Sequence, residues 1–144
     1  METGSSERSA NGAERLTPLM DFLNLLVDTA EERCDLDSKI SLEELSAENS
    51  LYAELGSGFT ETAYYGKRTV KTIPVLFLCR NGKQERCVSQ LESICNCLQR
   101  MEAYPQCETV AWMDTVIAKE PSKIGRDEDG VYHYSCILNN KIYY

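Results

Sequence analysis

Apolar residues recur at every third or fourth position in two segments, which predicts two amphipathic helices. The first begins at Thr17 and Pro18, because a hydroxyl residue caps a helix and proline suits its first position, and it runs to about Arg33. The second covers about 84–103, and we expect its polar side, including Gln90, to face water. The apolar stripe of this second helix consists of Cys87, Val88, Leu91, Ile94, Cys95, Leu98 and Met101.

Alternating polar and apolar residues predict strands in most of the remaining chain. A glycine-bearing turn follows 50–55, so we expect 59–65 to be its hairpin partner. The next strand should be central, because 75–79 is apolar on both faces, and Pro74 should mark a bulge or an unpaired edge. The predicted strands are 50–55, 59–65, 69–80, 108–119 and 131–144.

Two segments lack a clear period. Residues 35–50 fit a loop or a short helix, and 120–130 is polar and rich in turn residues. The order of the elements is helix, two or three strands, helix, two strands. This order predicts an α+β fold, with an antiparallel or mixed sheet of four to five strands and two helices packed on one face.

The length of 144 residues fits one domain with one hydrophobic core. Residues 1–15 are mostly small, polar or charged and have little to bury, so we expect a flexible N-terminal arm. The single domain should therefore occupy 16–144.

The amino-acid composition argues against several classes of binding partner for this protein. The formal charge of −8 and the lack of a basic run argue against free nucleic acid as a tight ligand. The longest apolar runs are too short to cross a bilayer, and the N-terminus lacks a secretory signal, so we expect no membrane contact and maturation in a cytoplasm. The seven cysteines should then be reduced, and their irregular spacing does not indicate a metal site.

The sequence shows no catalytic pattern. The acidic turn 127–130 lacks the ligand spacing of a calcium loop, so a solvated hairpin tip is the better interpretation. His133 is the only histidine and lies in a tyrosine-rich strand, and no nucleophile motif surrounds any serine or cysteine. We therefore expect neither enzymatic activity nor a cofactor.

Tyrosines near the C-terminus are the most informative side chains. Tyrosine combines rigid apolar area with a polar tip, which suits the margin of a core and a subunit interface equally well. Both interpretations stay open for this group, which comprises Tyr132, Tyr134, Tyr143 and Tyr144.

Several short motifs, taken in order over about 16–144, resemble the phage family of minor capsid proteins, which in turn is similar to the tail terminators of long-tailed phages. None of the motifs has catalytic specificity, so the resemblance depends on their joint order. They are Ser50-Leu-Tyr-Ala with Leu55-Gly-Ser, Tyr65-Gly-Lys-Arg, Pro74-Val-Leu-Phe-Leu, Leu91-Glu-Ser-Ile-Cys-Asn-Cys-Leu-Gln, Glu120-Pro-Ser-Lys-Ile-Gly-Arg-Asp-Glu-Asp-Gly and Tyr132-His-Tyr-Ser-Cys.

The resemblance implies a homohexameric ring at the head-proximal end of the virion tail, assembled in the host cytoplasm. Such a ring ends tail-tube polymerisation, contacts the tail-tube and head-completion proteins, and lets genomic DNA pass without specific binding. The sheet and the C-terminal strand would supply ring contacts, and the loops 56–68 and 120–130 would face the tube or the connector. The candidate interface residues are Tyr65, Lys67, Arg68, Asp127, Glu128, Tyr132, Tyr134, Tyr143 and Tyr144.

Two alternatives remain. A head-tail connector or a tail-tube subunit could share this size and class. A monomeric cytoplasmic module that binds a peptide at a free strand edge is the alternative from a different class.

Overall fold

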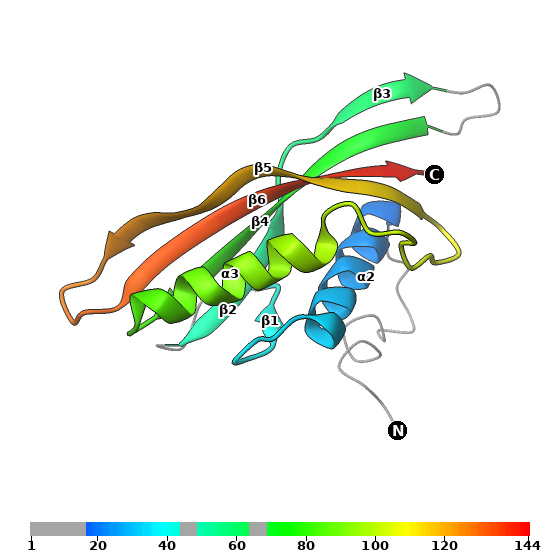
Figure 1. Cartoon of the computed structure of the whole chain (residues 1–144). Coiled ribbons are helices and arrows are strands. Elements are labelled where there is room, and N and C mark those ends of the chain that lie inside the picture. The colour runs from blue at the N-terminus through cyan, green and yellow to red at the C-terminus, as the bar shows by residue number, and fades with distance from the viewer. Residues whose placement is uncertain (1–16, 44–48, 64–68) are drawn as a thin grey trace.

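The computed structural model describes residues 17–43, 49–63 and 69–144. Within these residues the chain forms two helices and one sheet (Figure 1). The helices are α2 (Pro18–Arg33) and α3 (Gln84–Leu98). The strands are β1 (Ile40–Ser41), β2 (Ser50–Leu55), β3 (Phe59–Ala63), β4 (Thr69–Asn81), β5 (Ala111–Arg126) and β6 (Tyr132–Tyr143).

The sheet is mixed and five strands wide, in the order β1-β2-β4-β6-β5. Only the short β1–β2 pair is parallel among the described strands, and the others are antiparallel. Strand β4 lies inside the sheet, as the apolar pattern of 75–79 predicts. The predicted α+β fold class is confirmed.

The hairpin expected between 50–55 and 59–65 is wrong. Strand β3 does not fold back on β2 but follows it along the same edge of β4, so that Leu55 pairs with Val75 and Phe59 with Thr72. The three residues 56–58 thus lie opposite only two residues of β4, Ile73 and Pro74. This bulge at Pro74 confirms the expectation for the proline.

Gly58 is required in this bulge because its backbone lies very close to the backbone of β4. A Cβ atom at Gly58 would lie 2.5 Å from Cδ1 of Ile73 and 2.6 Å from the carbonyl oxygen of Thr72. No side chain fits there without a shift of the neighbouring strand.

The expected polar loop at 120–130 is also largely wrong. Strand β5 continues through this segment to Arg126, although its pairing with β6 is irregular at four places. The turn of the β5–β6 hairpin therefore lies just past the N-terminal end of α3, at the opposite end of the sheet from β3 (Figure 1).

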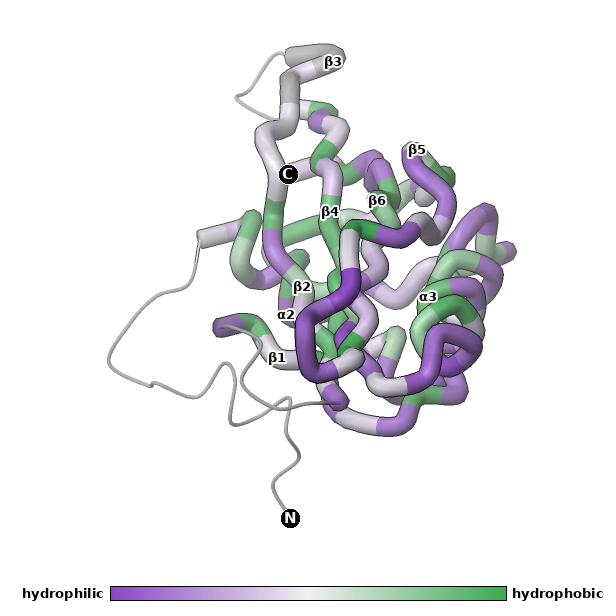
Figure 2. Tube along the Cα trace, turned by 90° about the vertical axis from the view of Figure 1, so that its left-hand side faces the viewer, coloured by the Kyte–Doolittle hydropathy of each residue, from purple (hydrophilic) through white to green (hydrophobic). Residues whose placement is uncertain are grey.

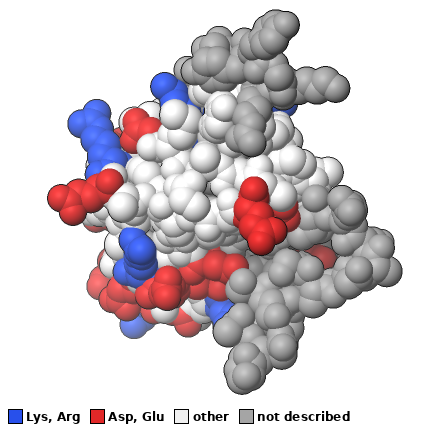
Figure 3. Space-filling view, turned by 90° about the vertical axis from the view of Figure 1, so that its right-hand side faces the viewer, with Lys and Arg blue, Asp and Glu red and all other residues white. Residues whose placement is uncertain are grey.

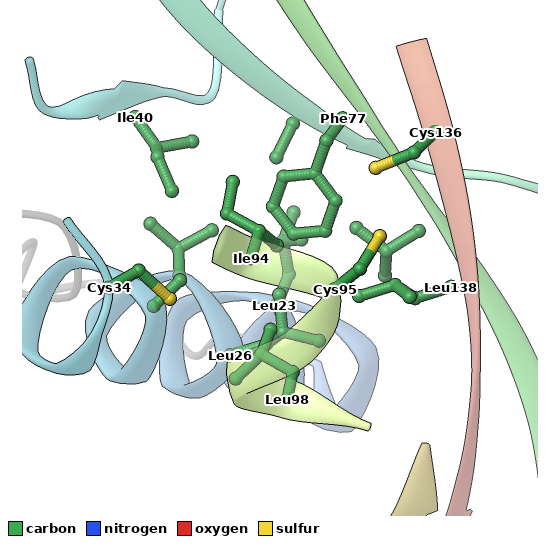
Figure 4. Packing of buried hydrophobic residues seen from close by; sticks show 14 of the residues in the cluster. Leu23, Leu26, Cys34, Ile40, Phe77, Ile94, Cys95, Leu98, Cys136 and Leu138 are labelled. Carbon is green, nitrogen blue, oxygen red and sulfur yellow. The ribbon is translucent and has the colours of Figure 1, made fainter. Parts of the chain in front are cut away.

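Both helices pack on one face of the sheet. Thr17 caps α2 as predicted, since its Oγ1 accepts a hydrogen bond from the amide of Met20 at 3.3 Å. Phe22 of α2 contacts Trp112 of β5 edge to face, with ring centroids 5.3 Å apart. Figure 4 shows the resulting core, in which Leu26 and Leu98 of the helices face the buried side of the sheet.

Helix α3 ends at Leu98, five residues earlier than expected, and Arg100 has a φ of 51°. The expectation that Gln90 faces water is wrong. Its side chain is 2% exposed, and its Oε1 accepts a hydrogen bond from the amide of Asp37 at 2.9 Å. The buried Gln90 side chain thus provides a hydrogen-bond acceptor for the backbone that follows α2. Much of the outer side of α3 is hydrophilic (Figure 2).

Candidate interaction surface

The face of the sheet that lies away from α2 and α3 is called the open face here. Successive side chains of a strand point to opposite faces, so the open face of β4 carries the residues between the fully buried positions Val75, Phe77 and Cys79. These are Leu76 and Leu78. Both are half-buried and lie outside the core cluster that contains the buried positions.

Strand pairing extends this apolar stripe to single residues of the neighbouring strands, between Glu54 of β2, which pairs with Leu76, and Lys119 of β5, which pairs with Ile137. Tyr52 of β2 pairs with Leu78, and Leu76 pairs with Ile137 of β6. Val116 of β5 has the same orientation, because it pairs with the residue two positions beyond Ile137. All of the apolar and aromatic side chains in this group are half-buried, and none belongs to the core or packs against it. The open face thus has a contiguous apolar centre.

Polar side chains surround this centre. A hollow of about 220 Å³ at the β3 end is lined by Thr72, Asp114, Val116, Asn139 and Lys141, of which Asp114 and Lys141 are paired across strands. The sequence contains the signal for the stripe, since 75–79 is apolar on both faces. That signal predicted only a central strand, and the open-face residues were missed.

The tip of the β5–β6 hairpin is held by charges. Nη2 of Arg80 lies 3.2 Å from Oδ2 of Asp127, and Nε2 of His133 lies 3.0 Å from its Oδ1. The imidazole nitrogen is close but poorly aligned for a hydrogen bond, so the contact is an ion pair when His133 is protonated. His133 and then Arg80 hold the pKa of the Asp127 carboxyl below its usual range. The turn closes through the amide of Asp127 and the carbonyl of Val131 at 2.8 Å.

The two predicted interface residues at this tip, Asp127 and Glu128, differ in their exposure to solvent. Glu128 is exposed, whereas Asp127 is engaged by its two neighbours. The predicted residues Tyr65, Lys67 and Arg68 lie outside the described part of the chain.

The C-terminal tyrosines do not form a free edge. Strand β6 lies between β4 and β5, so it has no edge at which it could extend the sheet. Tyr134 is buried at 7% exposure, whereas Tyr132, Tyr143 and Tyr144 are half-buried. Tyr132 lies beneath the side chains of Lys123 and Arg126, 5.5 and 5.3 Å from its ring centroid.

Acidic side chains gather elsewhere on the molecule. Figure 3 shows Asp and Glu residues on the helical side, at the lower part of the face drawn there. A hollow of about 320 Å³ beside α2 includes Asp21, Asp28 and Glu108 in its lining. This side contributes to the formal charge of −8.

The described residues contain no group of three or more His, Cys, Asp or Glu side chains placed to hold a metal ion. None of their helices is long and apolar enough to cross a membrane. The sequence matches no known family model and no curated protein.

Proposed function

We propose that the protein is a structural subunit that assembles with copies of itself. Following the resemblance described above, the assembly is the ring of a phage tail terminator at the head-proximal end of the virion tail. The ring caps the tail tube, ends its polymerisation and joins it to the head-completion proteins. The observation that carries the proposal is the apolar centre of the open face, which neither of the two described helices covers.

The composition of this face supports a protein partner. Specific interfaces combine an apolar, partly aromatic centre with a polar rim, and isolated apolar residues on a surface carry no such meaning. Here Tyr52, Leu76, Leu78 and Ile137 are neighbours in register across three strands. Arg80 and His133 lie at one end of the face, as a polar rim requires.

Ring closure adds a second requirement. A ring needs a heterologous contact, in which one patch meets a different patch on the next copy, whereas an open face that met itself would close a dimer. The edge strand β5 offers a surface that differs from the open face. Met113 and Ile124 of this strand are the large hydrophobic residues that are exposed among the described side chains, at 49% and 58%.

The net charge of the chain supports the proposed passage of genomic DNA through the ring. A net charge of −8 repels DNA, which favours passage of the genome without specific binding. No cofactor has a role in this proposal.

The peptide-binding alternative has less support. Among the described strands β5 lies at an edge of the sheet, but its pairing with β6 is irregular at four places. Bulged edges are poor templates for an added strand. A connector or tail-tube subunit would use the same kind of surface, so the identity of the partner separates these roles.

Native mass spectrometry of the full chain, alone and with a candidate tail-tube protein, tests the proposal. We expect six-fold masses for the natural protein and a loss of assembly for Leu78→Asp, which places a charge in the apolar centre. Asn96→Asp adds the same charge on an exposed position of α3 and should leave assembly intact. Circular dichroism checks that both variants are folded. A monomer under both conditions at every concentration would refute the ring.

A further inference from the structure

Six of the seven cysteines are grouped in pairs, because in each pair the neighbouring cysteine raises the pKa of its partner's thiol. All seven thiols are free. Figure 4 shows one pair, with the sulfur atoms of Cys95 in α3 and Cys136 in β6 directed toward each other. The pairs are Cys34 with Cys97, Cys79 with Cys87, and Cys95 with Cys136.

Only one of these pairs has a thiol within reach of a reagent in water. The two pairs in the core are 0–2% exposed, so an oxidant meets them only after local unfolding. Cys34 is 9% exposed, and Cys97 is half-buried near the end of α3. The pair of Cys34 and Cys97 is therefore the accessible one.

The backbone around this pair is held in place from both sides. Sγ of Cys97 lies 3.5 Å from the carbonyl oxygen of Arg33, the residue before Cys34. The amide of Asp35, the residue after Cys34, donates to Oγ of Ser93 at 3.1 Å. Ser93 and Cys97 are one helical turn apart, so the chain that leaves α2 is bound to one side of α3. Two thiols held in this way need little movement to form a bond.

We propose that Cys34 and Cys97 are a modification site, at which a disulfide oxidant such as glutathione disulfide forms an intramolecular bond between α2 and α3. The thiolate of Cys97 attacks one sulfur of the oxidant and releases one glutathione. The thiolate of Cys34 then attacks the Cys97 sulfur of the mixed disulfide and expels the second glutathione. Two electrons pass to the oxidant, and the two glutathione thiolates take up the two protons that the cysteines lose.

The order of these steps follows from exposure. The half-buried Cys97 meets the oxidant first. Burial, together with the contact to Cys97, raises the pKa of the Cys34 thiol to about 12, so Cys34 is protonated at neutral pH and acts second. The second step should accordingly limit the rate and accelerate with rising pH.

The new bond constrains the unfolded chain. It closes a long loop that contains β1 to β4 and most of α3, and long loops lose the most entropy when they are closed. We expect the midpoint of thermal unfolding to rise by about 10 °C.

The experiment oxidises the full chain with glutathione disulfide under native conditions, blocks the remaining thiols and maps tryptic peptides by mass spectrometry. We expect peptide 34–39 to be joined to peptide 87–100, with fragmentation assigning the bond to Cys97. The thermal midpoint should rise and return after reduction with dithiothreitol. Cys97→Ser should abolish both changes. Cys107→Ser, at a half-buried cysteine outside the three pairs, should keep them.

Three results would overturn the proposal. They are the absence of the bond in the natural protein, a bond that joins two chains, and a rise in the thermal midpoint that persists in Cys97→Ser. A second measurement covers the case in which Cys97→Ser does not fold. Brief alkylation of the folded natural protein should modify Cys97 and prevent the later bond, and an unchanged yield of the bond would contradict the mechanism.

Discussion

Replacement of Asn140 by alanine should destabilise the protein more than any surface change, because this side chain joins three strands in the core. It is fully buried in β6. Its Oδ1 accepts a hydrogen bond from Oγ1 of Thr115 in β5 at 2.6 Å, and its Nδ2 donates to the carbonyl oxygen of Ile73 in β4 at 3.0 Å. Thr115 in turn accepts a hydrogen bond from Nε1 of Trp112 at 2.7 Å.

The magnitude follows from the bonds removed. Asn140→Ala loses the bonds to Thr115, Ile73 and Leu138, and each is worth about 1 kcal/mol when its partners are buried. The loss should therefore be about 3 kcal/mol, and the cavity adds to it. At a typical urea dependence of roughly 2 kcal/mol per M, the unfolding midpoint would fall by about 1.5 M.

Urea unfolding followed by tryptophan fluorescence measures this loss, since the only tryptophan of the chain belongs to the network. Asn139→Ala is the matched control: the same change at the next residue, whose half-buried side chain points to the open face, should cost much less. Thr115→Val completes a double-mutant cycle with Asn140→Ala, and the two losses should be strongly non-additive. A loss below about 1 kcal/mol for Asn140→Ala, or equal losses at 139 and 140, would refute the reasoning.

Two further predictions concern the hairpin tip and the bulge. The pKa of Asp127 is lowered by His133, so its contribution to stability is complete above the ordinary value of 3.8 and is lost as pH falls through the lower folded value. Urea midpoints measured from pH 5 down to 2.5 should show a steeper acid loss in the natural protein than in Asp127→Asn. Gly58→Ala should cost about 1–3 kcal/mol by the same assay, because its Cβ would collide with Ile73. Gly82→Ala, with no atom within 4 Å of the added carbon, should be near neutral.

The helices and the central strand were predictable because their signals are local. Thr17 and Pro18 fix the start of α2 through the chemistry of one cap, and the period of α3 identifies its buried apolar residues, although not the buried Gln90. The end of α3 was not predictable, because the apolar stripe continues to Met101 although the helix stops at Leu98. Met101 still packs against the core from the segment that follows the helix.

The path of β2 and β3 depends on long-range pairing, which the sequence does not show. A turn of Gly, Ser and Gly permits a reversal and a bulge equally, and the choice was made by β4, which is long enough to pair with both strands. The same limit applies to β5. The polar residues from Glu120 to Arg126 lack strand periodicity, and they are extended because β6 lies beside them.

The tyrosines show why a composition signal did not locate the interaction surface. Aromatic enrichment near the C-terminus was expected at a core margin or an interface. Tyr134 is buried, and Tyr132 and Tyr144 pack against the core, so the structure supports the core margin for these three. Register, rather than residue type, decides which side chains gather on the open face. The register of β4 and β5 with β6 cannot be derived until the position of β6 between these two strands is known.

The open face leaves one physical problem that the described residues do not solve. Full burial of Leu76, Leu78 and Ile137 would contribute roughly 2 kcal/mol each to the free energy of folding or assembly, relative to full exposure. These side chains are only half-buried, so part of this free energy is not realised in the isolated chain. A two-layer protein that works alone normally has polar residues on such a face. Here the charged groups lie around the apolar centre, with Arg80 at one end and Lys141 at the other. A protein surface of matching size would exclude water from the centre and keep these charges at its rim, which makes the assembly state the decisive measurement.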